Sequence, residues 1–310
     1  MKLSVIIPSY NRADLIGKAV ESVCKVAHRP LEIVIVDDGS TDDTPAREPE
    51  IRHLCRAHTV ECQWVRQSNG GASVARNAGL NLSTGELVQW VDADDTVKAS
   101  GVEQLVAELT ANSDLDVVYG LVEVVDAKGR VLGAMGKAPM HQESDLFDLL
   151  WHTMGAVFRK QYLGPSLRWN PKIVLGDDWD FSSRVRISGA RYRFIPTTVG
   201  SYLKHDFGSL TITGFNERKC FNVIEAVLSI REALVAAGKL SPYLQQRCYN
   251  RALVHAVELS AHGSPLANRA YAICRDIGSQ SRALGLLADL LCMVPVKALH
   301  QLVFRILRSR

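Results

Sequence analysis

Carboxylate side chains are concentrated in one short segment of this 310-residue chain, GELVQWVDADDTV, at residues 85–97. An apolar run leads directly into Asp92, Asp94 and Asp95, three acids within four positions. Like charges this close repel one another, and shielding from water strengthens the repulsion. Mg²⁺ and Mn²⁺ prefer oxygen ligands, and one or two carboxylates plus substrate phosphates are their usual surroundings. We therefore predict that a divalent cation and a diphosphate complete this acidic cluster.

A second group of acids stands in LGDDWDFSSRV, where Asp177, Asp178 and Asp180 follow Gly176. Adjacent carboxylates raise each other's pKa, which suits a general base that works near neutral pH. The competing interpretation is an ordinary helix start, with Asp177 as the cap and Asp180 in the first turn, where the helix dipole favours negative charge. The sequence leaves both interpretations open.

Alternating strands and helices must position these acids. LSVIIP at 3–8 and EIVIVDD at 32–38 are apolar runs typical of strands buried in a parallel sheet. VECQWV at 60–65 and ELVQWV at 86–91 predict two further strands, with amphipathic helices in between. DVVYGLVEVVDAKGRVL predicts a hairpin that turns at residues 126–129. The pattern predicts an α/β doubly wound sheet that gains mixed strands later in the chain.

Polar residues follow the predicted strands at the places where a ligand is expected. In open α/β sheets, ligands bind beyond the carboxyl ends of the strands. Three polar clusters fall at such ends, at residues 8–11, 37–40 and 92–95. The sequence contains neither GxGxxG nor GxxxxGK[ST]. Because these glycine-rich phosphate cradles are missing, phosphate must be bound in another way.

Four segments together resemble family-2 glycosyltransferases with the GT-A fold, and the likeness extends from residue 3 to about 212. They are VIIPSYNRADLIGKAVESV, EIVIVDDGSTDDT, NGGASVARNAGLNLSTGELVQWVDADD and GDDWDFSSRV. The resemblance implies a Rossmann-like mixed sheet with helices on both faces. It also implies an enzyme that transfers a sugar from a nucleoside-diphosphate sugar with inversion at the anomeric carbon.

The resemblance implies nucleotide-binding roles for Pro8, Tyr10, Asn11, Asp38, Arg76 and Asp92. Tyr10 would stack on the base, and Asp38 would accept the imide N–H that uracil and thymine share, which favours a UDP- or dTDP-sugar. Arg76 would steady the base or the diphosphate. The alternatives are that Tyr10 packs half-buried, that Asp38 caps a turn through Gly39, and that Arg76 pairs with Asp37.

The implied metal ligands are Asp94, Asp92, Asp95 and His205. Asp94 would bind Mn²⁺ or Mg²⁺ directly, while Asp92 would face the ribose or metal-bound water. Asp95 either contacts the metal or caps the following helix, expected near residues 97–111. His205, in YLKHDFGSLT, is either a further metal ligand or a phosphate donor, although a single histidine is also often structural.

Asp178 corresponds to the general base of the family, which takes a proton from the acceptor hydroxyl. Asp177 stands where the family more often has glutamate, a departure that shortens one side chain. The expected acceptor-binding residues are Trp151, His152, Trp169 and Asp180. Core packing explains the tryptophans equally well. Assembly of a surface polysaccharide or glycolipid follows from family analogy alone.

Two further functions remain open from the sequence. A sugar-phosphate nucleotidyltransferase would need a glycine- and arginine-rich loop after the first strand, where PSYNRADL stands instead. A non-catalytic nucleotide-sugar binding or assembly subunit would act through the helical C-terminal region. Processive relatives of the family carry an Arg-Trp pair after the general base and have several membrane helices. Here Arg168 and Trp169 precede Asp178, and no 18-residue uncharged span exists, so a processive synthase is disfavoured. We therefore expect the transfer of a single sugar.

We place a domain boundary near residue 214. Residues 1–214 would form the catalytic domain, with the nucleotide-sugar half at about 1–97 and the acceptor half at about 98–214. Residues 215–310 would form a helical region, whose last segment, about 284–310, has an apolar stripe and a basic opposite side. That pattern is typical of a helix on an anionic membrane surface, or of one that packs on the catalytic domain or a second subunit.

Bulk properties indicate a protein that works inside the cell. The net charge of +3 is too small to indicate a nucleic-acid partner. Seven scattered cysteines without a CxxC pair suit a reducing cytoplasm. The start, MKLSVIIPSYN, lacks the features of a signal peptide. We expect a cytoplasmic location, and contact of the C-terminal segment with the inner membrane face is one of the two alternatives given above.

Overall fold

A computed structural model describes residues 1–204 and 215–279. These residues divide into two compact units. The ranges of the first unit are 1–141, 149–171 and 189–204, and those of the second are 142–148, 172–188 and 215–279. The domain boundary expected near residue 214 lies outside the described residues and stays a prediction, as do the halves expected within the catalytic domain.

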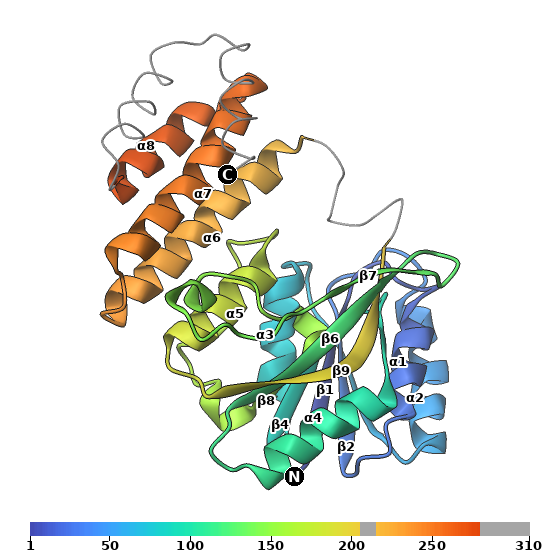
Figure 1. The fold of residues 1–310 in the computed structure, drawn as a ribbon. Coiled ribbons are helices and arrows are strands. Elements are labelled where there is room, and N and C mark those ends of the chain that lie inside the picture. Colours follow the sequence, from blue (N-terminus) through green and yellow to red (C-terminus); the bar gives the residue numbers. More distant parts are fainter. Residues whose placement is uncertain (205–214, 280–310) are drawn as a thin grey trace. The chain divides into compact units, whose positions relative to one another are not determined.

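The first unit is built on one mixed sheet (Figure 1). Its strands are β1 (Leu3–Ser9), β2 (Leu31–Asp37), β3 (Glu61–Arg66), β4 (Leu87–Trp90), β5 (Thr96–Val97), β6 (Val117–Val125), β7 (Val131–Met135), β8 (Ala156–Arg159) and β9 (Tyr192–Leu203). The strand order is β3-β2-β1-β4-β8-β6-β9-β5, and β7 pairs with β6. The pairs β3–β2, β2–β1 and β1–β4 are parallel, whereas β8 runs antiparallel to β4. The predicted doubly wound sheet with later mixed strands is confirmed.

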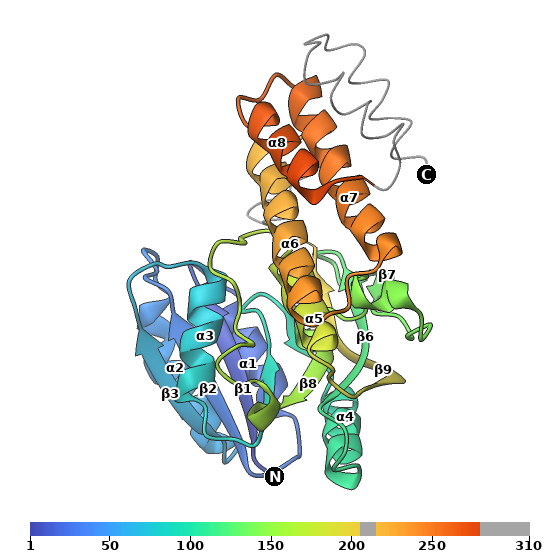
Figure 2. The same ribbon diagram turned by 90° about the vertical axis from the view of Figure 1, so that its left-hand side faces the viewer.

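Helices cover both faces of this sheet (Figures 1 and 2). They are α1 (Ile16–Cys24), α2 (Glu48–Ala57), α3 (Ala72–Leu82) and α4 (Ala99–Ala111). The buried faces of α1, α2 and α4 share one core with alternate strand residues such as Val5 and Ile33. The other helix, α3, packs on the opposite face, where a Cβ on Gly79 would lie 2.3 Å from Ile6 Cγ2. Glycine at position 79 therefore allows α3 to lie close to β1.

The predicted hairpin is also confirmed. Strands β6 and β7 pair antiparallel, and the N–H of Gly129 donates to the carbonyl of Asp126 over 2.9 Å. Gly129 has a φ of +77°, which glycine adopts without steric cost. The Asp126 carboxylate accepts hydrogen bonds from the backbone of Lys128 and Arg130. Local turn chemistry thus fixes this connection.

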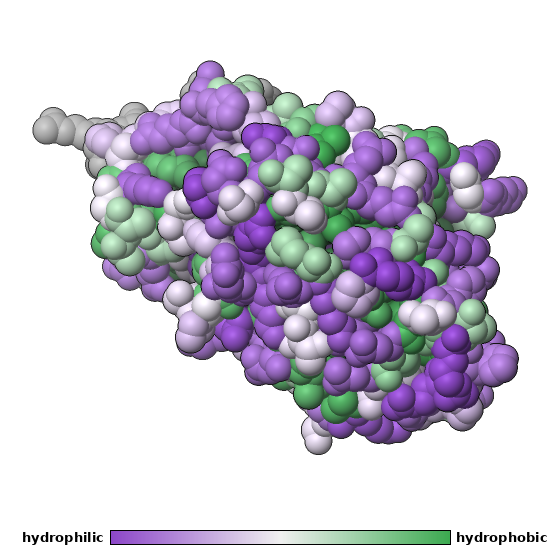
Figure 3. All heavy atoms as spheres, turned by 90° about the horizontal axis from the view of Figure 1, so that it is seen from below, coloured by the Kyte–Doolittle hydropathy of each residue, from purple (hydrophilic) through white to green (hydrophobic). Residues whose placement is uncertain are grey.

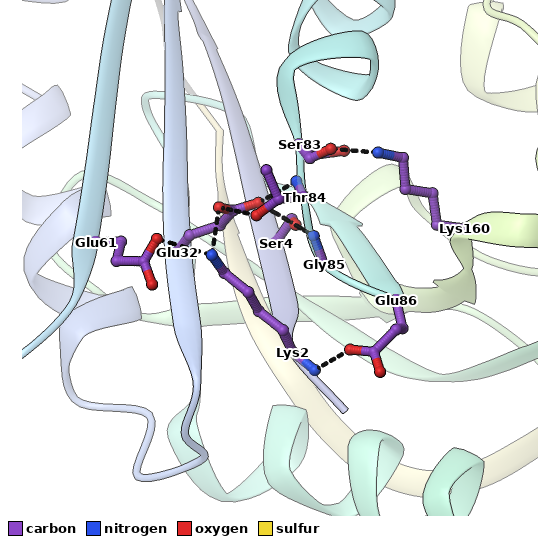
Figure 4. A network of polar contacts seen from close by, with 9 residues as sticks. All are labelled: Lys2, Ser4, Glu32, Glu61, Ser83, Thr84, Gly85, Glu86 and Lys160. Carbon is purple, nitrogen blue, oxygen red and sulfur yellow. Dashed lines mark hydrogen bonds and ion pairs between the residues drawn. The ribbon is translucent and has the colours of Figure 1, made fainter.

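A buried polar network holds the amino-terminal ends of the parallel strands together (Figure 4). Glu32, on β2, is fully buried and accepts hydrogen bonds from Ser4 Oγ at 2.5 Å and Thr84 Oγ1 at 2.7 Å. Its carboxylate also pairs with Lys2 Nζ at 2.9 Å. Burial opposes its ionisation, but these partners outweigh burial and lower the pKa of Glu32 to about 2. The network makes a charged group compatible with the interior.

The second unit is helical in the described residues. Its helices are α5 (Asp177–Ile187), α6 (Glu217–Ala236), α7 (Pro242–Ala261) and α8 (Ala267–Ile277). Asn216 Oδ1 accepts from the backbone of Lys219 at 2.8 Å and Ser241 Oγ from that of Leu244 at 3.1 Å, so both residues cap their helices. Gly238 and Gly263 follow α6 and α7 with positive φ, a common way for a helix to end. Figures 1 and 2 show α6, α7 and α8 side by side.

The surface of the described chain is mainly hydrophilic on the face drawn in Figure 3, with hydrophobic residues scattered between polar ones. Single apolar residues on a surface are ordinary in folded proteins. Within residues 1–204 and 215–279, every helix is too short or too polar to cross a membrane. The segment at 284–310, for which the sequence allows either membrane contact or packing on protein, lies outside the described residues.

Candidate functional site

The ends of β1, β2 and β4 meet at one edge of the sheet. Strand β1 lies between the other two, with Ser9 opposite Asp37 and Ile6 opposite Trp90. The segments that follow these strands are therefore neighbours. The backbone N–H of Asp38 donates to the carbonyl of Ser9 at 2.8 Å. The three polar clusters predicted at strand ends thus lie along one edge, as the fold class requires.

Arginine side chains pair with the acids that follow β4. Arg76, on α3, donates to Asp92 Oδ1 at 2.8 Å, and Arg12, after β1, donates through Nε to Asp94 Oδ2 at 3.1 Å. Asp95 is buried and accepts a hydrogen bond from the N–H of Leu203 at 2.9 Å. Among the described residues, the three carboxylates of this cluster thus lie beside two arginines that pair with Asp92 and Asp94.

The environment moves the pKa values of these acids in opposite directions. Burial raises the pKa of Asp95 well above its usual value, and the charges of Asp92 and Asp94 raise it further. Burial also opposes ionisation of Asp92, but the Arg76 guanidinium outweighs it and holds the pKa of Asp92 below its usual value. The repulsion predicted from the sequence is thus concentrated on Asp95.

Asp95 does not cap a helix, so that interpretation is wrong. Thr96 and Val97 form strand β5 rather than the start of a helix, and they pair with β9. Helix α4 begins only at Ala99, after Lys98. The physical reason is pairing with a distant strand, which brings Leu203 to the Asp95 carboxylate. The alternative, contact with a metal, stays a prediction.

Arg76 is held in place by a tryptophan. Its guanidinium carbon lies 4.5 Å from the centre of the Trp169 ring, and Trp169 packs edge-on against Trp90 with ring centres 5.4 Å apart. The side chain of Asn77 binds the backbone of Trp169 at both its N–H, at 2.9 Å, and its carbonyl, at 2.8 Å. The pairing of Arg76 with Asp37 considered from the sequence is wrong, since Arg76 pairs with Asp92. The Asp37 carboxylate instead accepts from the N–H of Ser40 and lies near Arg66.

Asp38 is enclosed by a loop at residues 67–71. Its carboxylate accepts hydrogen bonds from Gln67 Nε2 at 2.7 Å and from the N–H groups of Gly70 and Gly71 at 2.9 and 2.7 Å. Only 3% of Asp38 is exposed. A Cβ on Gly39 would lie 2.9 Å from the backbone nitrogen of Asn69, so this loop packs directly on residue 39. The nucleobase contact of Asp38 stays a prediction.

The segment after β1 contributes the other predicted nucleotide-binding residues. Pro8 is buried within β1, while Tyr10 is 45% exposed, so its ring is open to solvent. Asn11 has a φ of +52°, a conformation that asparagine tolerates better than most residues. Its Oδ1 accepts from the backbone of Thr41 at 2.8 Å, which ties the segment after β1 to the one after β2.

The predicted acceptor residues of the first unit are buried. Trp151 and Trp169 are each 2% exposed, and Trp151 packs against Tyr119 with ring centres 4.8 Å apart. His152 is also buried, with its ring 5.4 Å from that of Tyr202. Packing is the role that the structure shows for the tryptophans. Acceptor contacts stay predictions.

The acids of the second unit occupy the first turn of α5. Gly176 precedes the helix with a φ of +81°, and no side chain caps it, so the interpretation of Asp177 as the cap is wrong. Asp178 is half-buried, and its Oδ1 accepts from the N–H of Trp179 at 2.7 Å. Asp180 is fully buried and accepts from Nε and Nη2 of Arg184 at 3.0 and 2.6 Å. An ion pair on α5 thus occupies Asp180, whose acceptor contact stays a prediction.

The acids after β4 fit a divalent cation. They supply the carboxylate oxygens that Mg²⁺ and Mn²⁺ prefer, and the buried Oδ2 of Asp95 accepts no hydrogen bond from the described residues. Arg12 and Arg76 hold Asp94 and Asp92, so an ion would be bound by one or two of these carboxylates together with phosphate oxygens. His205 lies outside the described residues.

Sequence reasoning missed Arg12 and the enclosing loop at 67–71. Arg12 stands two residues after Tyr10, and the only available signal was that its segment follows the strand next to β4. The paired glycines at 70 and 71 were visible in the sequence, but their N–H groups donate to a carboxylate more than thirty positions earlier. Neither contact follows from local spacing.

Comparison with known proteins bears on this geometry. The sequence model described as glycosyl transferase family 2 matches residues 4–159. An uncharacterized glycosyltransferase from Nostoc is 33% identical over 156 residues, which are 50% of this chain and 47% of the relative, so the chain spans about half the length of that protein.

Two solved structures share the fold. TarS residues 1–349 of S. aureus, in complex with UDP-GlcNAc, has a TM-score of 0.67 at 19% identity, covering 97% of this chain and 91% of that one. A mannosyltransferase from Pyrobaculum calidifontis, in complex with GDP-Man and Mn²⁺, has a TM-score of 0.56 at 20% identity, covering 97% and 86%. These similarities establish a GT-A type of fold.

Proposed function

The chain belongs to glycosyl transferase family 2, and on that premise we propose that it is an inverting enzyme that moves a single sugar from a nucleoside-diphosphate sugar. The acceptor is a hydroxyl of a saccharide or glycolipid, and surface polysaccharide assembly is the expected setting. The observation that supports this proposal is the acidic cluster after β4, paired with Arg12 and Arg76 beside the ends of β1 and β2.

The donor is proposed to bind along the edge formed by β1 and β2. The exposed ring of Tyr10 is available to stack on the base. Each oxygen of Asp38 has two lone pairs, so the carboxylate can accept an imide N–H beside the donors from the 67–71 loop. Because Asp38 is buried, this contact requires the loop to move aside. The imide favours a UDP- or dTDP-sugar over a GDP-sugar.

The diphosphate is proposed to face the acids after β4. Asp94, Asp92 and Asp95 would hold Mn²⁺ or Mg²⁺, with His205 as a further ligand. When bound, such an ion offsets the negative charge that develops on the departing diphosphate. Arg12 and Arg76 already lie against these acids, and their guanidinium groups can form charge-assisted hydrogen bonds with phosphate oxygens. Trp169 keeps Arg76 oriented for that contact.

Asp178 is proposed to be the general base. Its carboxylate takes the proton of the acceptor hydroxyl while the hydroxyl oxygen forms a bond to the anomeric carbon. The bond from that carbon to the β-phosphate oxygen breaks on the opposite side, and the nucleoside diphosphate leaves with the electron pair. The attack from the opposite side inverts the anomeric centre. Asp177, beside it in the first turn of α5, would raise the pKa of the base.

The test separates donor binding from transfer. Donor binding is measured by calorimetry with Mn²⁺, and diphosphate release is measured with UDP- and dTDP-sugars over a panel of saccharide and glycolipid acceptors. Asp94→Ala should abolish the metal-dependent part of donor binding. Asp178→Asn should preserve donor binding but lower transfer by about 10²–10⁴-fold, the usual contribution of a general base. Asp114→Ala and Asp276→Asn, at exposed acids of the two units, are matched controls.

Three results would redirect the proposal. Near wild-type transfer by Asp178→Asn would remove that residue from the role of base. Donor binding without release on any acceptor would favour the non-catalytic binding subunit. Release of pyrophosphate from a nucleoside triphosphate and a sugar phosphate would favour the nucleotidyltransferase.

A further inference from the structure

Side chains with metal-binding chemistry converge in the second unit, at residues that the proposed function does not use. Cys220 on α6 and His255 and Glu258 on α7 each place one ligand atom within 4.8 Å of the other two. Cys220 and Glu258 are buried, while His255 keeps 14% of its side chain exposed. This is a group of three different donor types from two helices.

The position of this group in the helix pair is specific. The helices α6 and α7 pack against each other and are connected by residues 237–241. Cys220 stands in the first turn of α6, and His255 and Glu258 stand in the last two turns of α7. The group therefore lies at the end of the helix pair that is opposite the connection, where no covalent link holds the helices together.

The chemistry of the group matches zinc better than Mg²⁺ or Mn²⁺. Zinc binds thiolate, imidazole and carboxylate, whereas the harder cations prefer oxygen ligands. A thiolate and a carboxylate balance the two charges of Zn²⁺, so the bound site is neutral and suits its burial. Pairs of metal-ligand residues three positions apart on one helix are established in helical bundles, and His255 and Glu258 have this spacing.

We infer that Cys220, His255 and Glu258 bind Zn²⁺ and that the ion joins the first turn of α6 to the end of α7. Zinc sites with three protein ligands take a water molecule in the fourth position. The partly exposed side of His255 gives that water, and the incoming ion, a route from solvent. The inference does not depend on the proposed function, because it concerns residues outside the donor site.

Without metal, the same residues form a hydrogen-bonded group. His255 Nδ1 lies 3.2 Å from Glu258 Oε2, and the thiol of Cys220 is hydrogen-bonded to Glu258. Burial and the Glu258 charge raise the pKa of Cys220 to about 12, so the metal-free thiol is neutral and a poor nucleophile. Zinc would displace the thiol proton, and binding would release it to solvent.

Cobalt substitution tests the inference on the full chain. Co²⁺ is titrated in excess Mg²⁺, which occupies oxygen-ligand sites, and the thiolate-to-cobalt charge-transfer absorption is followed. We expect this absorption to saturate at one ion per chain and to disappear when Zn²⁺ is added. Since the acids after β4 include no sulfur, this signal is independent of the donor site. Zn²⁺ at roughly a hundred times its Kd should raise the Tm by about 5 °C.

Variants assign the signal to the residues. Cys220→Ser should lose both the charge-transfer absorption and the zinc-dependent Tm shift, and Glu258→Gln should weaken zinc binding at least about tenfold. Cys248→Ser is the matched control, because Cys248 is buried on α7 with a pKa also raised to about 12 by burial, and it should keep both signals. Circular dichroism checks that each variant remains helical.

Several results would overturn the inference. Folded wild-type protein that shows no sulfur charge transfer with Co²⁺ contradicts it directly, and so does an equal zinc-dependent Tm shift in Cys220→Ser. If Cys220→Ser does not fold, the cobalt spectrum of the wild-type protein and its stoichiometry still test whether the metal binds through a cysteine. Loss of the absorption in Cys248→Ser, with retention in Cys220→Ser, would assign the metal to another cysteine.

Discussion

Buried carboxylates lie at both ends of the parallel strands of the first unit. Glu32 at one end and Asp95 at the other differ in their hydrogen-bond partners and in the direction of their pKa shifts. At the amino-terminal end, Glu32 is surrounded by donors from Lys2, Ser4 and Thr84, and its pKa falls to about 2. At the carboxyl-terminal end, Asp95 accepts from the Leu203 N–H, while burial and neighbouring acids raise its pKa. Both oxygens of Glu32 have donors, whereas Oδ2 of Asp95 accepts no hydrogen bond from the described residues.

We expect this difference to separate a structural role from a functional one. A carboxylate with complete local partners stabilises the native state, since its charged form is favoured on folding. A carboxylate among other acids is destabilising by itself, and such residues persist where a ligand completes them. The comparison therefore predicts opposite consequences for substitutions at the two ends of the same sheet.

The largest effect is expected from Glu32→Gln. The amide keeps one acceptor oxygen but replaces the other with an NH2 group that faces the donors of a buried network, and it removes the charge that pairs with Lys2. The free energy of unfolding should therefore fall by about 3–5 kcal/mol. Urea unfolding measures this, and activity per folded molecule should stay unchanged. Glu61→Gln, at the exposed partner of Lys2, is the control and should cost less than about 1 kcal/mol. Equal losses in both variants would contradict a special role for Glu32.

Acid titration sharpens the same contrast. The pKa of Glu32 is depressed from 4.5 to about 2, so its contribution is complete above pH 4.5 and is lost as the pH falls through about 2. That shift corresponds to about 3 kcal/mol. The difference in unfolding free energy between wild type and Glu32→Gln should therefore shrink across this window. A difference that stays constant from pH 5 to pH 2 would count against the assignment.

Asp95→Asn should have the reverse pattern. The amide keeps an oxygen for the Leu203 N–H and removes one of the repelling charges, so stability should stay within about 1 kcal/mol of wild type or rise. Transfer should fall by about 10–100-fold if the residue contacts the metal. Thermal unfolding and diphosphate release measure the two quantities. A large loss of stability with full activity would make Asp95 a structural acid like Glu32.

The smallest effect is expected from Arg12→Gln. Arg12 pairs with Asp94 over 3.1 Å, so it competes with a cation for that carboxylate. Its removal should tighten the binding of Mn²⁺ in the absence of donor a few-fold, about 0.5–1 kcal/mol, as expected for a partly exposed ion pair. Calorimetry checks this, with Arg130→Gln at the exposed Asp126 pair as control. Weaker Mn²⁺ binding in Arg12→Gln would show that Arg12 organises the cluster rather than competes.

Much of the fold could be predicted from the sequence, because its strongest signals are local. The apolar runs at β1 and β2 and the turn residues 126–129 determine their own structure, and the polar clusters at strand ends follow from the parallel arrangement. The partners of Asp94 and Asp95 could not be predicted, since Arg12 and Leu203 are 82 and 108 positions away. Those contacts depend on strand order, which local spacing does not encode.

For a related reason, the sequence could not show whether the predicted acceptor residues line a binding site or pack in the core. The residue type alone does not distinguish a tryptophan that lines a pocket from one that fills a core. Trp151 and Trp169 are both buried. For Asp177, the helix-start pattern was visible, but Gly176 leaves the helix without a side-chain cap. Sequence patterns located the elements, whereas the orientation of single side chains depended on packing.

Asn77 forms two hydrogen bonds with the backbone of Trp169. The path of the loop at residue 169 and the surroundings of Arg76 therefore depend on different parts of that residue, the main chain and the indole. Because both hydrogen bonds of Asn77 go to the main chain of residue 169, they do not depend on the side chain at that position. The indole contacts Arg76 and Trp90. A substitution at position 169 should therefore change those surroundings more than it changes the path of the loop.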